Sequence, residues 1–470
     1  MITVTARKTE ESLQDAPVAV SAFTAKAIES QGLRSIDDLA KLAPGLSFSQ
    51  AFGRTTDRPV IRGQSNVLAG FQFGVESGTA YFIDGVYYPG DIQGIDFDSL
   101  ERVEVVKGPQ SALYGRNTYA GAINFITRQP GESEAHVKAG VAEFGEQEYS
   151  FSAGTSFLDG RLGGRLSARS YEYDGEQVNE LTGKKVGQES TKSVSLSLNY
   201  KPTDDFKVSF TGLYRKDDDG LIAQFLQYAS DNNCKPGYRS TLYRDPAGAA
   251  TSGGNPNQYF CGEIKPGVVR INSEPMPVLV GGVTQVRDGT AFDGAEKDEF
   301  FGALRMDWDI GGTGWTATAL GGFRDATKML GAEDYSEAFV IIPQFNPSTF
   351  NFAFPDNSEP LFTNTYRNDY RDSSAELRIA SPSSERLRGL LGVYRFDYED
   401  RSSDLIFSAP REGLSSGSAR LCATSAEPCV PATPTPGTVG GGDIGAPRAF
   451  TGAFRKSRTF GLEVRSDFKL

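Results

Sequence analysis

Four cysteines and one histidine are the residues of this chain whose chemistry depends most on spacing. The cysteines form two close pairs, Cys234 with Cys261 and Cys422 with Cys429, in segments rich in glycine, proline or asparagine. In an exported protein this spacing predicts two local disulfides, and unpaired loop thiols are the alternative. A zinc site is disfavoured because the chain has no Cys-x-x-Cys motif and no histidine besides His136.

No catalytic constellation accompanies these residues. His136 is the only candidate for the base of a catalytic triad, and it stands in a predicted strand, where we expect it to face solvent or a lumen. The chain has neither a cluster with metal-ligand spacing nor a glycine motif that would hold phosphate. The sequence therefore offers no candidate catalytic site, and we expect the protein not to be an enzyme and to need no cofactor and no bound metal.

Length, charge and hydropathy narrow the class further. With 470 residues the chain is too long for one ordinary domain. Its 48 basic and 60 acidic residues give a net charge of −12, which disfavours nucleic acid as a partner. Hydrophobic residues are only 38% and no run of 18 apolar residues occurs, so helical membrane spans are excluded. This composition fits either a membrane β-barrel or a soluble β-sandwich.

The first 130 residues predict a small domain of mixed strands and two helices. Thr24 caps a helix that Gly32 ends, and Ser35 with Asp38 forms a capping-box-like start for a second. A strand over 103–106 is stopped by Gly108-Pro109, because proline lacks a backbone donor. We expect the remaining elements to be strands near 18–23, 46–48, 58–62, 79–83 and 121–127, with one helical turn at 110–114.

From about residue 134 onward the pattern alternates with period two, which predicts antiparallel strands. Leu196 and Leu198 then share one face, and Ser195 and Ser197 the other. Short links alternate with long ones, as is typical of outer-membrane barrels with short periplasmic turns and long extracellular loops. About ten strands are predicted, near 135–142, 146–155, 161–173, 191–200, 206–215, 297–309, 314–325, 367–380, 386–398 and 456–468.

Three ordered motifs in the first domain resemble the plug domain of TonB-dependent outer-membrane receptors. They are Ile61-Arg62-Gly63, the run Tyr81 to Val86, and the segment 101–128 with its Gly-Pro, Leu-Tyr-Gly and Ala-Ile-Asn pieces. The resemblance implies an α+β plug domain followed by antiparallel transmembrane β-barrel strands, in the outer membrane of a Gram-negative bacterium. The divisions expected are a flexible N-terminal segment with the TonB box at 1–15, a plug at 16–130 and barrel strands at 134–470.

Ten strands are too few for this architecture, because an open sheet leaves unpaired edges in lipid. A barrel that encloses a plug takes about 22 strands. We therefore expect the chain to hold the plug and the first part of a barrel, with an upstream signal sequence and about ten or more further strands.

The resemblance also implies site residues. Arg62 and Arg116 are expected to latch the plug by pairing with barrel-wall glutamates, among which Glu376 and Glu463 are candidates. The N-terminal segment is expected to be extended and unpaired, so that TonB captures it by strand addition. Its TonB-binding residues are Ile2, Thr3, Val4, Thr5 and Ala6. The candidate ligand-binding residues lie in loops and are Phe52, Arg54, Tyr238, Arg239 and Tyr259.

The function implied is active uptake of a scarce solute, with a ferric siderophore expected first and cobalamin or a carbohydrate as alternatives. A surface protein that binds or adheres without transport is the alternative from another class. The partners expected are TonB with its inner-membrane energising complex, outer-membrane lipid, and a small-molecule or metal-chelate ligand.

Overall fold

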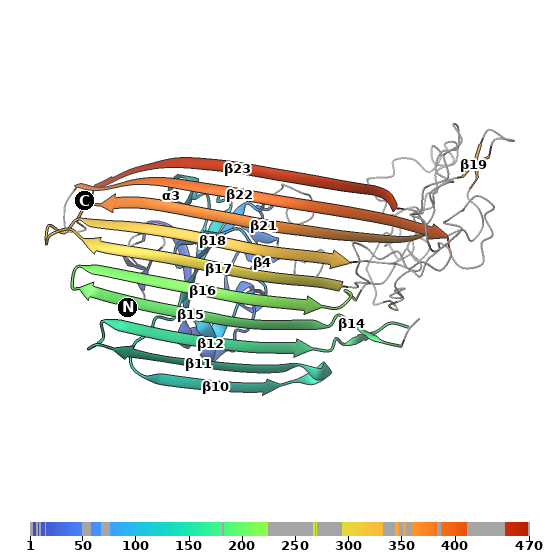
Figure 1. Ribbon diagram of the computed structural model, residues 1–470, viewed down its shortest axis with the longest axis horizontal. Helices are drawn as coiled ribbons and strands as arrows, with labels where there is room; N and C mark the ends of the chain where they lie inside the picture. The colour runs from blue at the N-terminus through green and yellow to red at the C-terminus, as the bar shows by residue number, and fades with distance from the viewer. Residues whose placement is uncertain are drawn as a thin grey trace, which may run out of the picture.

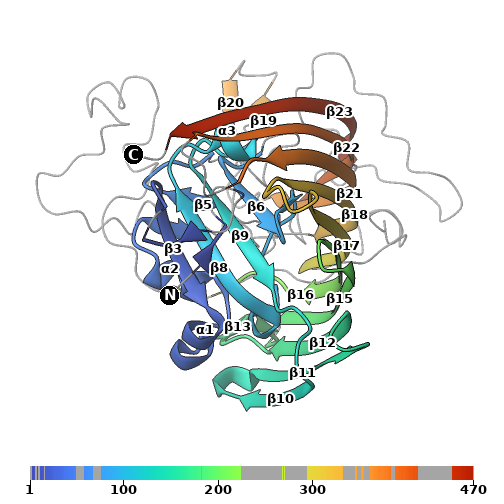
Figure 2. The same ribbon diagram turned by 90° about the vertical axis from the view of Figure 1, so that its left-hand side faces the viewer.

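The chain folds into an N-terminal α+β domain and a ten-stranded antiparallel sheet, the wall, which curves around one side of that domain (Figures 1 and 2). Within the described residues, no helix is both long and apolar enough to cross a bilayer. The computed structural model describes residues 3–5, 8, 11–14, 16–48, 58–66, 76–180, 183–223, 267, 269, 294–331, 344–346, 351–353, 360–382, 387–410 and 447–468.

The N-terminal domain is built on a mixed five-stranded sheet. Its strand order is β3-β8-β9-β6-β7, in which only β6 and β9 run parallel. β-Branched residues favour the interior strand β8, whose Val103, Val105 and Val106 are fully buried. The bounds are β3 Ala19–Thr24, β6 Thr79–Ile83, β7 Val86–Tyr88, β8 Leu100–Lys107 and β9 Gly121–Thr127, with the small pairs β1 Thr3–Val4 with β2 Glu11–Ser12 and β4 Leu46–Phe48 with β5 Pro59–Ile61.

The predicted helix starts are confirmed. Helix α1 (Ala25–Gln31) begins where Thr24 Oγ1 accepts the amide of Ala27, and it ends at Gly32, whose φ of 63° favours glycine. Helix α2 (Ile36–Leu42) begins at Ser35, whose side chain accepts the amide of Asp38. The helical turn α3 spans Ser111–Tyr114, and the 3₁₀ turns η1 and η2 span Phe97–Ser99 and Glu143–Gly145.

The wall confirms the ten predicted strands and their antiparallel order along the chain. Several extend further than the alternation predicted, at the ends joined by long links. Two of those links contain small hairpins, β13–β14 (Gln177–Val178, Lys185–Val186) and β19–β20 (Gln344–Asn346, Asn351–Ala353). The wall strands are β10 Glu134–Val141, β11 Gln147–Phe157, β12 Leu162–Tyr173, β15 Glu189–Thr203, β16 Phe206–Asp219, β17 Gly294–Asp309, β18 Thr316–Gly331, β21 Pro360–Ala380, β22 Leu387–Pro410 and β23 Pro447–Phe468.

The two faces of the wall have different surroundings. On the convex face Leu196 and Leu198 are 38% and 39% exposed, whereas Ser197 on the concave face is 6% exposed. The predicted parity of these residues is confirmed. The concave face is not an open lumen at this point, because it faces the N-terminal domain (Figure 2). An arginine side chain at position 197 would therefore have to find space against the N-terminal domain as well as contact with water.

We expect Leu196→Arg to destabilise the protein in bilayers by about 2–4 kcal/mol if the side chain lies near the midplane, because arginine is costly on a lipid-facing strand. Leu196→Phe keeps an apolar side chain and serves as the control. The measurement is the free energy of unfolding in lipid vesicles. Equal stability of the two variants would mean that this face does not contact lipid.

The domain and the wall share one apolar core. Wall residues Leu213, Phe301 and Leu320 lie in the same buried cluster as Val86 and Tyr88 of β7. The rings of Tyr88 and Phe301 meet edge to face, 5.3 Å apart. At Gly322 of β18 an added Cβ would lie 2.4 Å from the Val86 side chain, so a glycine is required for this close approach. The two parts are therefore packed together and not merely adjacent.

Candidate functional site

The N-terminal segment is docked on the domain and not free. β1 pairs with β2 in the register Thr3 with Ser12 and Val4 with Glu11. The Val4 side chain is fully buried, in a cluster with Phe82 and Tyr114 among others. The segment is extended as predicted, but the prediction that it is unpaired is wrong for this conformation. Ile2 and Ala6 lie outside the described residues.

Thr5 fixes the segment through its polar atoms. Its amide donates to both carboxylate oxygens of Glu104 at 2.9 and 3.0 Å, and its hydroxyl lies 3.0 Å from Glu104 Oε2. Asn124 donates to the Thr5 hydroxyl at 3.1 Å, and the Tyr114 hydroxyl donates to the Thr5 carbonyl at 3.3 Å. Glu104 is fully buried and is also bound by Arg102 at 2.8 Å. The backbone donor of Thr5 is thus already used inside the domain.

Lys8 connects the same segment to the wall. Its Nζ atom lies 2.9 Å from Glu376 Oε1 on β21, and both side chains are nearly buried. Arg378, two residues along the strand, lies 3.3 Å from the same oxygen. Glu376 therefore contacts the N-terminal domain, as expected of a wall glutamate, but its partner is a lysine of the N-terminal segment. The side chain of Glu463 is not among those described.

The predicted pairing of Arg62 and Arg116 with wall glutamates is wrong in the described part of the chain. Arg116 instead bonds to both carboxylate oxygens of Glu76, within the domain. It reaches the wall through the ring of Phe396 on β22, with 5.0 Å from the guanidinium carbon to the ring centre. Arg62 is exposed, forms no salt bridge to a described residue, and lies beside Gly108.

A buried ion cluster joins the loop after β7 to the wall. Asp91 of this loop lies 3.0 Å from Lys297 and 3.1 Å from Arg215. Glu299 lies 3.3 to 3.4 Å from Lys297, Arg215 and Arg324, and the Tyr88 hydroxyl bonds to it. The wall side chains of the cluster are at most 6% exposed and comprise Arg215, Asp217, Lys297, Glu299, Arg324 and Asp372.

The cluster holds Asp91 as a charged group. Burial favours the neutral acid, but the positive charges of Lys297 and Arg215 outweigh it and hold the Asp91 pKa at about 2. This pKa lies below that of an aspartate in the unfolded chain. The contact therefore stabilises the fold fully at any pH above the unfolded pKa, and this stabilisation is lost as the pH falls toward about 2. At neutral pH the domain is therefore ionically anchored to the wall.

This buried ion cluster was not predicted, although the sequence contains a signal for it. Arg215 faces Glu299 across β16 and β17, and Arg324 faces Asp372 across β18 and β21. All four occupy the concave-face parity of consecutive strands, where opposite charges in register indicate an ion network. The alternation assigns each side chain to a face of the strand, but it does not show which of these charges are buried.

The remaining predicted site residues lie outside the described residues. These are the candidate ligand-binding residues Phe52, Arg54, Tyr238, Arg239 and Tyr259, and the cysteines Cys234, Cys261, Cys422 and Cys429. Their assignments stay predictions.

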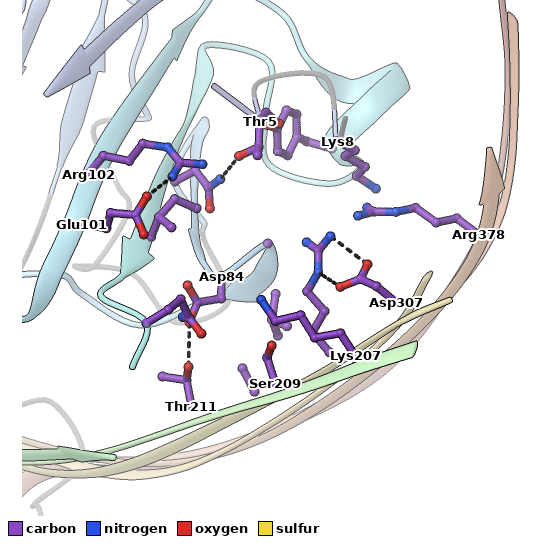
Figure 3. Close-up of a pocket in the computed structure, with 18 residues that line it drawn as sticks. Thr5, Lys8, Asp84, Glu101, Arg102, Lys207, Ser209, Thr211, Asp307 and Arg378 are labelled. Atoms are coloured by element: carbon purple, nitrogen blue, oxygen red, sulfur yellow. Dashed lines mark hydrogen bonds and ion pairs between the residues drawn. The ribbon is translucent and has the colours of Figure 1, made fainter. Parts of the chain in front are cut away.

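Next to the docked N-terminal segment is a polar cavity of about 400 Å³ (Figure 3). Thr5 and Lys8 line one side of it, and the turn after β6, with Asp84, lines another. The wall contributes side chains of β16, β17 and β21 near the short turns that join the wall strands. Ions and small polar molecules fit a space of this size.

Comparison with known proteins identifies the domain. Residues 12–122 match the family TonB-dependent Receptor Plug Domain. The vitamin B12 transporter BtuB of Vibrio vulnificus is 30% identical over 215 residues, which make up 44% of this chain and 34% of that protein. The ferrichrome outer membrane transporter/phage receptor of Escherichia coli is 24% identical over 45% of this chain and 27% of its own length. The chain thus aligns with about a third or less of these two relatives.

The fold agrees with this match. The structure of Pseudomonas aeruginosa FpvA bound to a heterologous pyoverdine superposes with a TM-score of 0.60 at 15% identity. That superposition covers 100% of this chain and 52% of the FpvA chain. Residues 12–122 are thus a TonB-dependent receptor plug domain, and the chain as a whole, with its curved wall of antiparallel strands, has the fold of TonB-dependent outer-membrane receptors.

Proposed function

We propose that the protein imports a scarce solute across the outer membrane in a TonB-dependent step, and that the solute is a ferric siderophore. Residues 2–6 act as the segment that TonB captures, and residues 16–130 act as the plug that the captured segment displaces. The partners in this proposal are TonB with its inner-membrane energising complex, outer-membrane lipid and a metal-chelate ligand. We assign the protein no enzymatic step.

The docking of Thr3–Thr5 on the plug carries this proposal. An extended segment bound through a few backbone hydrogen bonds can exchange one strand partner for another, which is what capture by strand addition requires. The segment contacts the plug through Glu104 of β8 and the wall through Glu376, so pulling on it acts on both. A pure adhesin would have no use for such a connection.

The choice of solute rests on the relatives. Two of these proteins carry the name of an iron chelator in their descriptions, ferrichrome in one and pyoverdine in the other. Cobalamin is the second candidate, because the relative at 30% identity is a vitamin B12 transporter. Both solutes are too large and too dilute to enter efficiently through open pores, which fits an energised receptor.

Deleting residues 1–10 from the intact receptor is expected to abolish energy-dependent uptake and to leave surface binding of the solute unchanged. Cells that carry either form are supplied with radiolabelled ferric siderophores or cobalamin, and bound and internalised label are counted separately. Internalisation of cobalamin alone would replace the siderophore assignment. Undiminished uptake after the deletion would contradict TonB-dependent import and leave a binding or adhesion role.

A further inference from the structure

The cavity beside the N-terminal segment lies between the plug and the wall, at the end of the wall where its strands are joined by short turns. On its plug side it meets the β6–β7 turn, where Asp84 accepts a hydrogen bond from Thr211 of β16 at 2.7 Å. Beyond that contact, the apolar packing of Val86 and Tyr88 on the wall closes the interface. A solute that passes on this side of the plug would therefore enter this cavity last.

Cationic side chains from five separate segments line the cavity. Figure 3 shows Lys8, Lys207 and Arg378 around one space, and Arg102 and Arg305 also line it. The carboxylates that line it are Asp84, Glu101 and Asp307.

Each of these carboxylates is already engaged. Asp84 accepts hydrogen bonds from the amide and hydroxyl of Thr127 and the hydroxyl of Thr211. Asp307 is bound by two nitrogens of Arg305, at 2.6 and 2.8 Å, and Glu101 is bound by Arg102.

Lys207 differs from the other cationic side chains that line the cavity. It is exposed within the structure and forms no salt bridge with a described residue. Asp307 is opposite it in the β16–β17 register, but Arg305 holds that carboxylate at both oxygens. An ammonium group beside a polar cavity, with its nearest cross-strand carboxylate occupied, attracts an anion.

We propose that this cavity is a second solute site on the exit side of the plug, and that it binds a carboxylate or similar oxyanion group of the solute through Lys207. The inference rests on the proposed uptake function and adds to it a preference for anionic solutes. Because Thr5 and Lys8 form one side of the cavity, removal of the N-terminal segment opens the site.

Citrate, a small tricarboxylate, is the probe. Isothermal titration of the intact receptor in detergent at low ionic strength should show saturable binding of citrate. As a control for ionic strength, sodium chloride at the ionic strength that the added citrate produces should not compete with citrate for the site. Lys207→Gln should weaken citrate binding by about tenfold, the effect of losing one charge-assisted hydrogen bond. Lys207→Arg, which keeps the charge, should retain most of it.

Lys216→Gln is the matched control, since Lys216 lies on the same strand with its side chain exposed on the opposite face. Its citrate affinity should equal that of the unmodified protein. Absence of citrate binding, or equal losses in the Lys207 and Lys216 variants, would overturn the site while leaving uptake untouched. Undiminished uptake after deletion of residues 1–10 would instead remove the proposed function, whatever citrate does.

Discussion

Replacing Asp91 with asparagine is expected to loosen the plug from the wall and to lower the free energy of unfolding by about 3–5 kcal/mol, the cost of removing one partner from a buried ion pair. Asp91 receives Lys297 at 3.0 Å and Arg215 at 3.1 Å. Without it, Glu299, at 3.3 Å, is the one remaining ion-pair partner of Lys297 among the described residues, and the lysine side chain is 2% exposed. Asparagine has the same shape, so the loss is of charge and not of packing.

Asp98→Asn provides the control. Asp98 also belongs to the plug and also contacts a wall lysine, Lys138, at 2.9 Å, but these side chains are 35% and 39% exposed. An ion pair at that exposure contributes about 0–1 kcal/mol. Chemical unfolding of both variants in detergent measures the difference in the free energy of unfolding. The rate at which a large antibiotic enters cells shows whether the plug still blocks passage along the wall. Equal stabilities would mean that the buried ion cluster does not anchor the plug.

The strands were predictable because each wall strand places one face outward and one inward. Leu196 and Leu198 alternate with serines, and that alternation is local information. The helix starts at Thr24 and Ser35 were predictable for the same reason, since a cap and the backbone amide that donates to it lie within four residues. Local rules therefore recovered the elements and their order.

The contacts of the site were not predictable in this way. Thr5 and Glu104 are 99 residues apart, and Lys8 and Glu376 are 368 apart, so no periodicity relates them. Arg116 was expected to pair with a carboxylate of the wall. It instead donates to both carboxylate oxygens of Glu76, which lies within the plug. Only the folded chain determines which carboxylate lies within reach of the Arg116 guanidinium group.

Val4→Pro is expected to abolish energy-dependent uptake while the affinity for the solute at the cell surface stays unchanged. Proline removes the backbone donor of residue 4 and fixes φ, so the segment cannot complete the ladder that strand addition needs. The same substitution also removes a side chain that is fully buried against the plug. Loss of uptake by Val4→Pro alone therefore leaves two explanations, a lost donor or a lost anchor.

Val4→Ala separates them, because alanine loses the buried side chain but keeps the donor and the extended conformation. If TonB captures the backbone, Val4→Ala and Thr3→Ser should import at close to the normal rate, and Val4→Pro should not. If docking on the plug is what matters, the alanine variant should fail as completely as the proline variant. Surface binding and internalised label are measured in the same cells. Normal import by Val4→Pro would remove residues 2–6 from the coupling role, and a lost surface affinity would show that the segment supports the solute site instead.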